Sequence, residues 1–428
     1  MTPTPSHPSL AQRLVIVIGA GLAGWTTVRE FRKLDSTTPV LLVTADSGDF
    51  YAKPTLSNAF AQKRTAAQLV TTPAGKMVET LKVTLLAHTS VLRIDTTAQV
   101  LYTASGELPY RDLVLATGAL PIHVPVKGDA AAQVVSVNSL QDFSAFHAVL
   151  TAENSCEYSS KIGAAGSPAL KQVVIMGAGL IGCEFANDLA TAGYRVTVVD
   201  PASRALAALL PAAASHQLQA ALSALPTPVQ WRWGRTVAAL DAAAGALQIT
   251  LSDGESLAAD VVLSAIGLRA DTRLALAAGL ECERGIVVNR HLQTSAPHVY
   301  ALGDSAQYSN GGTSSVVLPF VMPIMHAAKA LAATLAATSA DKPTQVNFPL
   351  MPIAVKTPAL PLVVALPAPG TPGQWVAVVV SAQEGEWHWK DEKAVLPDSV
   401  RGFVLAGAAT PRRAKLAATV MASEAAVG

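Results

Sequence analysis

Two turns of the form Gly-x-Gly-x-x-Gly stand out in this chain. In the first, Gly19, Gly21 and Gly24 follow the apolar run 14–18 and precede a helical pattern. The first glycine permits a tight turn, the second lets the backbone approach a pyrophosphate, and the third allows close packing of helix on strand. The phosphates then face the free N–H groups at the start of the helix. Asp46, shortly after the next apolar run, is placed to accept hydrogen bonds from ribose hydroxyls.

The second turn has the same form, with Gly177, Gly179 and Gly182 between an apolar run and a helical pattern. Asp200 ends the strand that follows this helix. An acid at that position bonds both ribose hydroxyls of NADH and repels the extra phosphate of NADPH. The sequence therefore favours NADH, although Arg204 is close enough to leave NADPH open.

The same strand–helix–strand unit thus occurs twice, which predicts two nucleotide sites. The elements expected around the turns are helix 24–33, strand 40–44, strand 173–176, helix 181–192 and strand 195–199. The stretch 154–168, rich in Ser, Gly and Ala, is expected to be a surface insertion. A third block from about residue 320 has short strands expected at 353–356, 362–365 and 375–380. The predicted class is α/β, with two Rossmann-like domains and a small C-terminal α/β domain.

The amino-acid composition limits which partners and cofactors the protein is expected to bind. Half of the 428 residues are hydrophobic and the formal net charge is +1, so no global field favours nucleic acid or an anionic membrane. Cys156, Cys183 and Cys282 form no Cys-x-x-Cys pair and fit a reducing cytoplasm. No signal peptide or membrane span is predicted, because the apolar stretch 14–25 is short and interrupted by glycines. The nine histidines have no metal-ligand spacing, so no metal is expected.

A second pair of signals accompanies the first turn. Thr117-Gly118 ends one apolar run, and Gly303-Asp304 ends another. Glycine lets the backbone come close to a ligand, and the Asp304 carboxylate can bond a polyol hydroxyl such as the ribityl chain of a flavin. The alternative for Asp304 is an ordinary turn residue at a strand end.

These motifs resemble the pyridine nucleotide–disulfide oxidoreductase superfamily over nearly the whole chain. Within it, the chain resembles the rubredoxin reductases, and the resemblance rests on the segments 44–46, 51–57, 182–188, 320–325 and 355–358. It implies a flavoenzyme that passes electrons from NADH through FAD to rubredoxin, a small acidic iron protein, often in support of alkane hydroxylation. It also implies an FAD-binding domain at 1–120 and 270–320, an NAD-binding domain at 121–269 and a small domain at 321–428.

The residues implied at each site follow from the same resemblance. Lys53 and Glu184 are the candidate catalytic residues, and we expect them to pair across the domains. For FAD the candidates are Gly19, Ala20, Gly21, Leu22, Ala23, Gly24, Asp46, Lys53, Pro54, Val91, Thr117, Gly118, Asp304, Val321 and Lys356. For NAD they are Gly177, Gly179, Leu180, Ile181, Gly182, Glu184, Asp200 and Gly267.

Two lysines carry the expected charge near the flavin. Lys53 precedes Pro54 in the loop where the family places the flavin ring, and its ammonium would stabilise negative charge on reduced flavin. Lys356 lies in an apolar strand, where a cation needs an anionic partner. The alternatives are a surface lysine at position 53 and a snorkelling lysine at position 356. Some relatives carry a second cation where this chain has Asn58, which leaves the charge arrangement open.

The absence of cysteines after the first glycine turn argues against redox chemistry that uses a cysteine. Disulfide reductases, peroxidases and CoA-disulfide relatives need redox cysteines after the first glycine turn, and residues 24–91 contain none. The flavin is therefore expected to pass electrons directly to an outside acceptor, and a monomer fits this chemistry. The alternatives are a ferredoxin or flavorubredoxin reductase and, from another class, a non-catalytic FAD- and NADH-sensing protein. Arg412, Arg413 and Lys415 form either a face for an acidic partner or a solvated surface.

Overall fold

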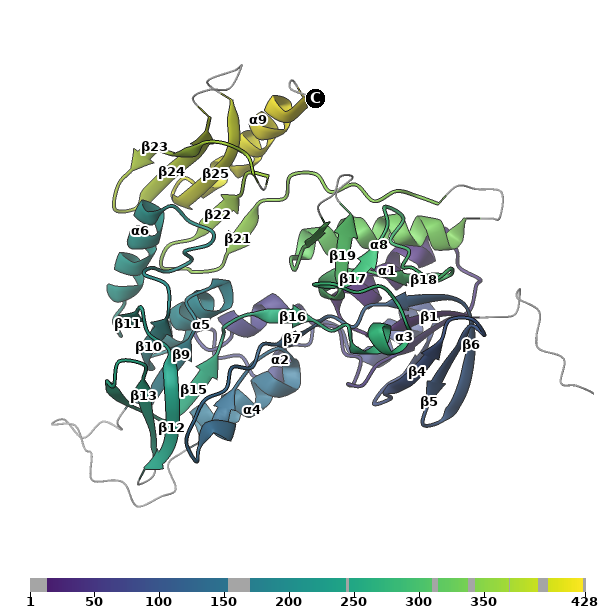
Figure 1. The fold of residues 1–428 in the computed structure, drawn as a ribbon, viewed down its shortest axis with the longest axis horizontal. Helices are drawn as coiled ribbons and strands as arrows, with labels where there is room; N and C mark the ends of the chain where they lie inside the picture. The colour runs from purple at the N-terminus through teal and green to yellow at the C-terminus, as the bar shows by residue number, and fades with distance from the viewer. Residues whose placement is uncertain are drawn as a thin grey trace, which may run out of the picture. The chain divides into compact units, whose positions relative to one another are not determined.

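The computed structural model describes residues 14–152, 170–243, 246–309, 315–337, 343–368, 370–391 and 399–425 (Figure 1). The stretch 154–168 and Cys156, for which the sequence carried expectations, lie outside the described residues. The chain forms two compact units by its internal contacts. The first unit contains Met1–Ala52, Val70–Leu120 and Leu268–Phe348, and the second contains Lys53–Leu69, Pro121–Gly267 and Pro349–Gly428.

The first unit is built on a parallel sheet that carries an antiparallel extension. Its parallel strands are β1 (Leu14–Ile18), β2 (Val40–Val43), β3 (Thr84–Leu86), β6 (Gly106–Leu115) and β18 (Val299–Ala301). The extension adds β5 (Val100–Thr103) and β4 (Val91–Asp95) beside β6. The strand order is β3-β2-β1-β6-β5-β4, with β18 also paired to β6. β1 and β2 are almost wholly buried, as continuous apolar runs in a parallel sheet require.

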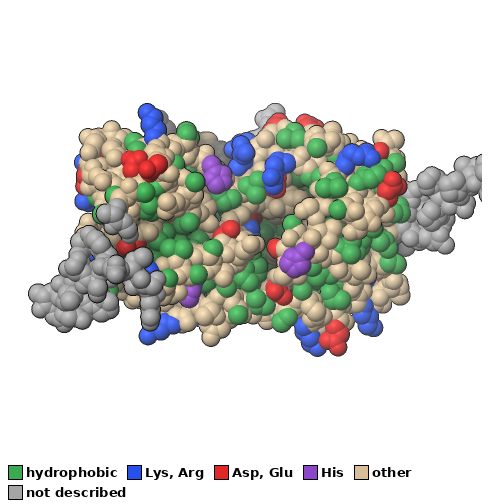
Figure 2. All heavy atoms as spheres, turned by 90° about the horizontal axis from the view of Figure 1, so that it is seen from below, with side chains coloured by type: hydrophobic (Ala, Val, Ile, Leu, Met, Phe, Trp, Pro, Cys, Tyr) green, Lys and Arg blue, Asp and Glu red, His purple; other side chains and the backbone are tan. Residues whose placement is uncertain are grey.

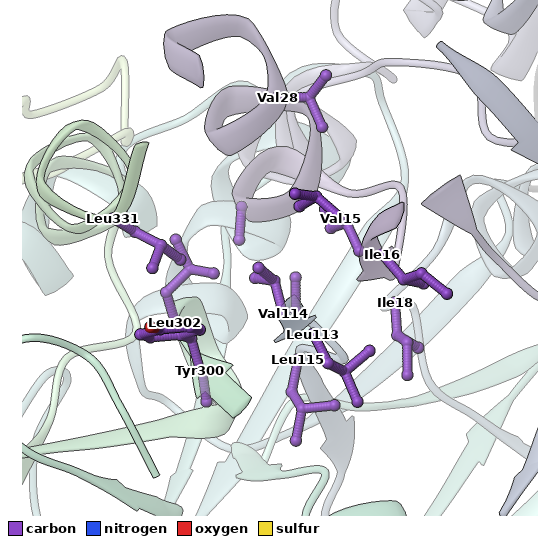
Figure 3. Close-up of a cluster of buried hydrophobic side chains, with 14 of the residues drawn as sticks. Val15, Ile16, Ile18, Val28, Leu113, Val114, Leu115, Tyr300, Leu302 and Leu331 are labelled. Carbon is purple, nitrogen blue, oxygen red and sulfur yellow. The ribbon is translucent and has the colours of Figure 1, made fainter. Parts of the chain in front are cut away.

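Helices cover this sheet and complete its core. α1 (Leu22–Leu34) packs against α8 (Val321–Ala336), and Figure 3 shows Val28 of α1 above Val15 of β1, and Leu331 of α8 to the left of Val15. The remaining elements of the unit are α3 (Ala74–Leu81), β7 (Ala119–Pro121), β16 (Leu268–Ala270), α7 (Arg273–Ala277), β17 (Ile286–Val288), η4 (Gly303–Ser305), β19 (Ala306–Ser309) and β20 (Ser315–Val317). β7 pairs with β16 at the two points where the chain passes between units, and β17, β19 and β20 form a small sheet.

The second unit repeats the parallel arrangement. Its five-stranded sheet has the order β11-β10-β9-β15-β8, with all described pairs parallel. The strands are β8 (Val134–Val135), β9 (Gln172–Met176), β10 (Arg195–Asp200), β11 (Gln230–Trp233) and β15 (Val261–Ser264). The other elements are η2 (Lys53–Asn58), α2 (Ala66–Leu69), η3 (Ala131–Gln133), α4 (Leu140–Thr151), α5 (Leu180–Thr191), α6 (Ala212–Ser223) and the meander β12 (Val237–Ala243), β13 (Ala246–Leu251) and β14 (Ser256–Ala259).

A second sheet of this unit is formed by the C-terminal residues. Its antiparallel order is β21-β22-β25-β24-β23, and α9 (Arg413–Ala425) packs against β25, as the yellow end of the chain in Figure 1 shows. The strands are β21 (Ile353–Val355), β22 (Leu362–Ala365), β23 (Gln374–Val380), β24 (Glu384–Lys390) and β25 (Val400–Gly407), and η5 (Thr410–Arg412) precedes α9.

The sequence therefore predicted the elements around both turns to within two residues. The expected strands at 353–356, 362–365 and 375–380 are confirmed as β21, β22 and β23. The α/β class with two Rossmann-like folds and a small C-terminal fold is also confirmed. The division into three domains stays a prediction. Among the residues that the structure describes, no helix is both long and apolar enough to cross a bilayer.

Candidate nucleotide and redox sites

The first glycine turn is held by two close approaches that only glycine allows. Gly19 has φ +104°, and a Cβ there would lie 2.3 Å from the carbonyl oxygen of Ala116. A Cβ on Gly24 would lie 1.9 Å from the carbonyl oxygen of Gly19. Gly21 differs, because a Cβ on it would meet nothing within 4 Å. The outer glycines are thus required by packing, whereas the middle glycine borders open space.

The second turn repeats this geometry residue for residue. Gly177 has φ +103°, and its Cβ would lie 2.7 Å from the carbonyl oxygen of Ala265. A Cβ on Gly182 would lie 1.9 Å from the carbonyl oxygen of Gly177, and one on Gly179 would meet nothing within 4 Å. In both turns the first glycine packs on an Ala-x-Gly loop at the end of a parallel strand. Gly118 and Gly267, the last residues of these loops, have φ +72° and +117°.

Each turn leads into a helix whose first N–H groups have no side-chain cap. The N-cap residues of α1 and α5 are Gly21 and Gly179, and neither helix has an acidic residue in its first turn. Uncapped N–H groups and the positive end of the helix dipole together favour an anion. Leu22 and Ala23 begin α1 as Leu180 and Ile181 begin α5. Both turns therefore fit the pyrophosphate of a dinucleotide.

Asp304 lies close to the first turn. Gly303 has φ +78°, and a Cβ on it would lie 2.9 Å from the Cβ of Ala23 in the first turn of α1. Gly303 donates its N–H to the hydroxyl of Tyr308 at 2.8 Å, which fixes the short helix η4 that carries Asp304. The structure thus brings the Gly303-Asp304 motif beside the first glycine turn, as the expected flavin-binding role requires.

Three further residues that the sequence singled out lie in the first unit. Thr117 donates its hydroxyl to the carbonyl of Asp271 at 2.9 Å. Val91 begins β4, two residues after Thr89, whose N–H donates to the Thr44 carbonyl at 2.8 Å. Ala20 is buried.

The two acids at the ends of the second strands are held differently. Asp46 is exposed, and its Oδ1 accepts from the Thr44 hydroxyl at 2.6 Å. Asp200 accepts from the backbone N–H of Ala178, inside the glycine turn, at 2.6 Å and from that of Ala202 at 2.7 Å. The turn itself therefore fixes the Asp200 carboxylate.

The Arg204 guanidinium forms hydrogen bonds to residues other than Asp200. Its Nη1 donates to the Leu210 carbonyl at 2.9 Å and to the Ser215 hydroxyl at 3.0 Å. These partners lie at the start of α6 and just before it. Because the guanidinium is held there, Arg204 is a weaker argument for NADPH binding than its position in the sequence indicated.

Glu184 lies at the centre of a buried hydrogen-bonded ring. Its carboxylate accepts from the Ser57 hydroxyl at 2.6 Å and from the Lys356 backbone N–H at 2.9 Å. The Lys356 ammonium donates to the carbonyl of Pro54 at 2.7 Å, and the Ser57 hydroxyl oxygen lies 3.4 Å from the same carbonyl oxygen. Helix α5, the 3-10 helix η2 and the end of β21 are thereby joined.

Lys53 enters this neighbourhood from η2. Its ammonium donates to Oδ1 of Asn138 at 3.2 Å. The charge of Lys356 acts on the Glu184 carboxylate. The pairing of Lys53 with Glu184 stays a prediction, and the structure adds Lys356 as a cation beside the same carboxylate.

Burial shifts both charged groups of the ring toward their neutral forms. Desolvation raises the pKa of Glu184, and the hydrogen bond from Ser57 and the charge of Lys356 oppose that shift. Desolvation lowers the pKa of Lys356, and the Glu184 carboxylate opposes it. Each group therefore supports the charged form of the other.

Two other expectations gain detail. Helix α8 begins at Val321, two residues before Pro323, and Val321 and Met322 are exposed. Arg412 is paired with the carboxylates of Glu384 and Glu386, so its charge is largely neutralised. The structure therefore does not support Arg412 as a free cation for an acidic partner.

Four residues of this region had no role assigned from sequence. Ser57 and Asn138 bond Glu184 and Lys53, while Asn187 and Asp188 lie buried on α5. A signal existed for the last two, since adjacent polar residues interrupt an otherwise apolar helix that packs on a sheet. Their partners are distant in sequence, which is why the pattern alone could not identify them.

The charged side chains on the face in Figure 2 are interspersed, and neither sign forms a large field there. This agrees with the formal net charge of +1.

Comparison with known proteins shows two family matches. The profile described as pyridine nucleotide-disulphide oxidoreductase matches residues 13–333, and the one described as rubredoxin binding C-terminal domain matches residues 345–420. A rubredoxin-NAD(+) reductase of Alcanivorax borkumensis is 40% identical over 404 residues, which cover 94% of this chain and 97% of that protein. A nitric oxide reductase FlRd-NAD(+) reductase of Aeromonas salmonicida is 41% identical over 354 residues, covering 82% of this chain and 84% of that protein.

Solved structures share the fold at lower identity. The covalent putidaredoxin reductase–putidaredoxin complex matches with a TM-score of 0.81 at 24% identity, covering 96% of this chain and 94% of that chain. The water-forming NADH oxidase from Lactobacillus brevis bound to NADH matches with a TM-score of 0.80 at 18% identity, covering 96% and 91%.

We predict that Gly179→Ala and Gly182→Ala separate binding from folding. Gly179→Ala should unfold at the wild-type temperature but bind NAD(+) about tenfold or more weakly, because its methyl group enters the space open to the pyrophosphate. Gly182→Ala should lose about 1–3 kcal/mol of stability, because its methyl group meets backbone. Thermal unfolding and calorimetric titration measure the two effects. Wild-type affinity in folded Gly179→Ala would contradict this assignment.

We also predict a change in the pH dependence of stability for Glu184→Gln. Because the folded-state pKa of Glu184 is raised, the folded protein holds a proton that the unfolded chain releases, so stability falls as the pH rises above about 4.3. Glutamine does not ionise; its Oε1 can accept from the Lys356 N–H, and its Nε2 can donate to the Ser57 hydroxyl, so the site stays hydrogen-bonded. The stability of the variant relative to wild type should therefore increase with pH over this window, as urea unfolding at several pH values would measure. A constant difference would mean that the Glu184 pKa is not raised.

Proposed function

Because the chain belongs to the pyridine nucleotide-disulphide oxidoreductase family, we propose that it is an FAD-dependent NADH:rubredoxin oxidoreductase. The observation that carries the proposal is the joint presence of two glycine turns and a C-terminal sheet. The turns fit two dinucleotides, and the match to the rubredoxin binding C-terminal domain spans residues 345–420, which include that sheet. The relative from Alcanivorax borkumensis, itself named a rubredoxin-NAD(+) reductase, supports the same acceptor.

FAD is assigned to the first turn and NADH to the second. Bound FAD would supply the exchange between the two-electron chemistry of NADH and the one-electron chemistry of an iron carrier. The Gly21 turn would hold the FAD pyrophosphate, and Asp304, beside the same turn, would bond the ribityl hydroxyls. Lys53 and Lys356 would supply positive charge to the reduced ring.

NADH is favoured over NADPH by the second unit. The Asp200 carboxylate is fixed by the N–H groups of Ala178 and Ala202, where it would accept from ribose hydroxyls and repel a phosphate. Arg204, the cation nearest in sequence, donates to Leu210 and Ser215 instead.

A second acceptor is supported by a specific comparison. The FlRd-NAD(+) reductase of Aeromonas salmonicida is 41% identical, which nearly equals the 40% of the rubredoxin-NAD(+) reductase from Alcanivorax borkumensis. Flavorubredoxin is therefore the alternative acceptor. A cytoplasmic location and service in alkane hydroxylation belong to the same proposal. Of the described cysteines, Cys183 and Cys282 are free thiols.

Anaerobic mixing tests the proposal. The purified protein should carry a yellow flavin that NADH bleaches, and the bleached protein should rapidly reduce added rubredoxin, followed by absorbance. Bleaching followed by transfer only to a flavorubredoxin would select the alternative acceptor. Failure of NADH to bleach the flavin would reject the enzyme and favour a nucleotide-sensing protein.

We predict that Asp200→Asn relaxes the choice of donor. Loss of the carboxylate removes the repulsion of the 2′-phosphate, so the ratio of kcat/KM for NADH to that for NADPH should fall about tenfold or more. Steady-state rates with each donor measure the ratio. Glu255→Gln, on a carboxylate bonded to Arg232 and Arg235, is the matched control and should keep the wild-type ratio. An unchanged ratio in Asp200→Asn would overturn the assignment of Asp200.

We predict that Lys356→Met makes the flavin harder to reduce. Its ammonium is a half-buried cation in the ring around Glu184, and a cation near reduced flavin stabilises the negative charge. The midpoint potential should therefore become more negative in spectroelectrochemical titration. Lys76→Met, at an exposed pair with Glu79, is the control that should leave the potential unchanged. Equal potentials in all three proteins would place Lys356 away from the flavin.

A further inference from the structure

Helix α5 buries three polar side chains along one stretch. Glu184, Asn187 and Asp188 are only 4%, 1% and 2% exposed. Buried polar and charged groups are costly unless hydrogen bonds satisfy them. The hydrogen-bond partners of these three side chains lie largely in two segments distant in sequence, and most of the donors are backbone N–H groups.

Asp188 holds the segment that follows η2. Its Oδ2 accepts from the Phe60 N–H at 2.8 Å, and its Oδ1 accepts from the Ala61 N–H at 2.9 Å. The Phe60 ring adds packing, with centroids 5.4 Å from Phe143 and 5.5 Å from Phe146. The end of the segment that carries Lys53 is thus fixed on α5.

Asn187 holds the segment that follows β21. Its Oδ1 accepts from the Ala359 N–H at 3.0 Å, while its Nδ2 donates to the Thr191 hydroxyl at 3.3 Å on the same helix. Thr357 and Leu360 close the local turn, since the Thr357 hydroxyl donates to the Leu360 carbonyl at 2.7 Å. The segment that carries Lys356 is thus fixed three residues beyond the lysine.

We propose that Asn187 and Asp188 are positioning residues for Lys53 and Lys356. The bonds from Asn187 and Asp188 reach the backbone beyond each lysine, whereas Glu184 and Pro54 bond the Lys356 backbone and ammonium directly. Helix α5 also starts at the second glycine turn, so one rigid element carries both the NADH turn and the anchors of the two lysines. This inference rests on the proposed function, because it assumes that the lysines serve a bound flavin.

The physical reason is the cost of unpaired donors. An apolar residue at position 187 would leave the Ala359 N–H without its acceptor, and a neutral amide at position 188 offers one acceptor atom where the carboxylate offers two. The backbone would move to find new partners, and the lysine on each segment would move with it.

The test compares Asn187→Leu and Asp188→Asn with two matched variants. Asn187→Asp keeps an oxygen that accepts from Ala359, and because burial favours the neutral carboxyl, its O–H can replace the donor toward Thr191, so it should restore the wild-type properties. Thr197→Val removes a part-buried hydrogen bond from Gln172, 3.1 Å long, in the same unit but on strand β10. It controls for simple destabilisation.

Two readouts are measured in the flavin-loaded protein. Amide hydrogen exchange should be about tenfold faster at Ala359 in Asn187→Leu and at Phe60 or Ala61 in Asp188→Asn. The flavin absorption maximum and midpoint potential should shift in both variants, and should match wild type in Asn187→Asp and Thr197→Val. If Asn187→Leu does not fold, Asp188→Asn decides the test.

The outcomes distinguish this inference from the proposed function. A wild-type protein that holds no flavin, or whose flavin NADH does not bleach, would reject the proposed function. A wild-type protein that reduces rubredoxin, with flavin spectra and potentials equal in Asp188→Asn and Thr197→Val, would overturn the positioning role alone. Faster exchange without any change in the flavin would also overturn it, because the segments would then move without consequence for the lysines.

Discussion

The backbone N–H groups at the start of a helix need acceptors, and helices α1 and α5 offer none from their own side chains. Gly21 and Gly179 stand at the N-caps, where Ser, Thr, Asp or Asn would normally supply an oxygen. The surrounding glycines are compelled by contacts of 1.9 to 2.7 Å that any Cβ would make with backbone oxygens. Each turn is therefore a tight strand–helix junction whose backbone N–H groups remain available to a ligand. These N–H groups are what allows each turn to bind the pyrophosphate of a dinucleotide.

The second unit builds its charged groups around one of these helices. Glu184 accepts from two segments that are distant in sequence, and burial raises its pKa while it lowers that of Lys356. Such a pair is stable only if its hydrogen bonds are complete, since each charge alone would be buried at high cost. The ring through Ser57 and Pro54 supplies those bonds. A helix that begins at a nucleotide turn thus also fixes the groups that the flavin is expected to need.

Local patterns in the sequence were sufficient for both turns and for the strands and helices around them. Spacing determines such junctions because the contacts of Gly19 with Gly24 and of Gly177 with Gly182 span only five residues. The partners of Glu184 could not be predicted in this way, since Ser57 is 127 residues away and Lys356 is 172 residues away. The partners of two arginines could not be predicted from the sequence either. Arg204 donates to Ser215 on α6, and Arg412 pairs with Glu384 and Glu386. The residues adjacent to each arginine in the sequence do not indicate these partners.

A crystal structure of the protein with FAD and NAD(+) bound tests the central claim most directly. The account predicts the FAD pyrophosphate on the N–H groups that follow Gly21 and the NAD(+) pyrophosphate on those that follow Gly179. It also predicts the adenosine ribose of NAD(+) within hydrogen-bonding distance of Asp200. The account would be contradicted if either pyrophosphate bound elsewhere in the structure with both cofactors. It would also be contradicted if the first N–H groups of α1 or α5 contacted no anion in that structure.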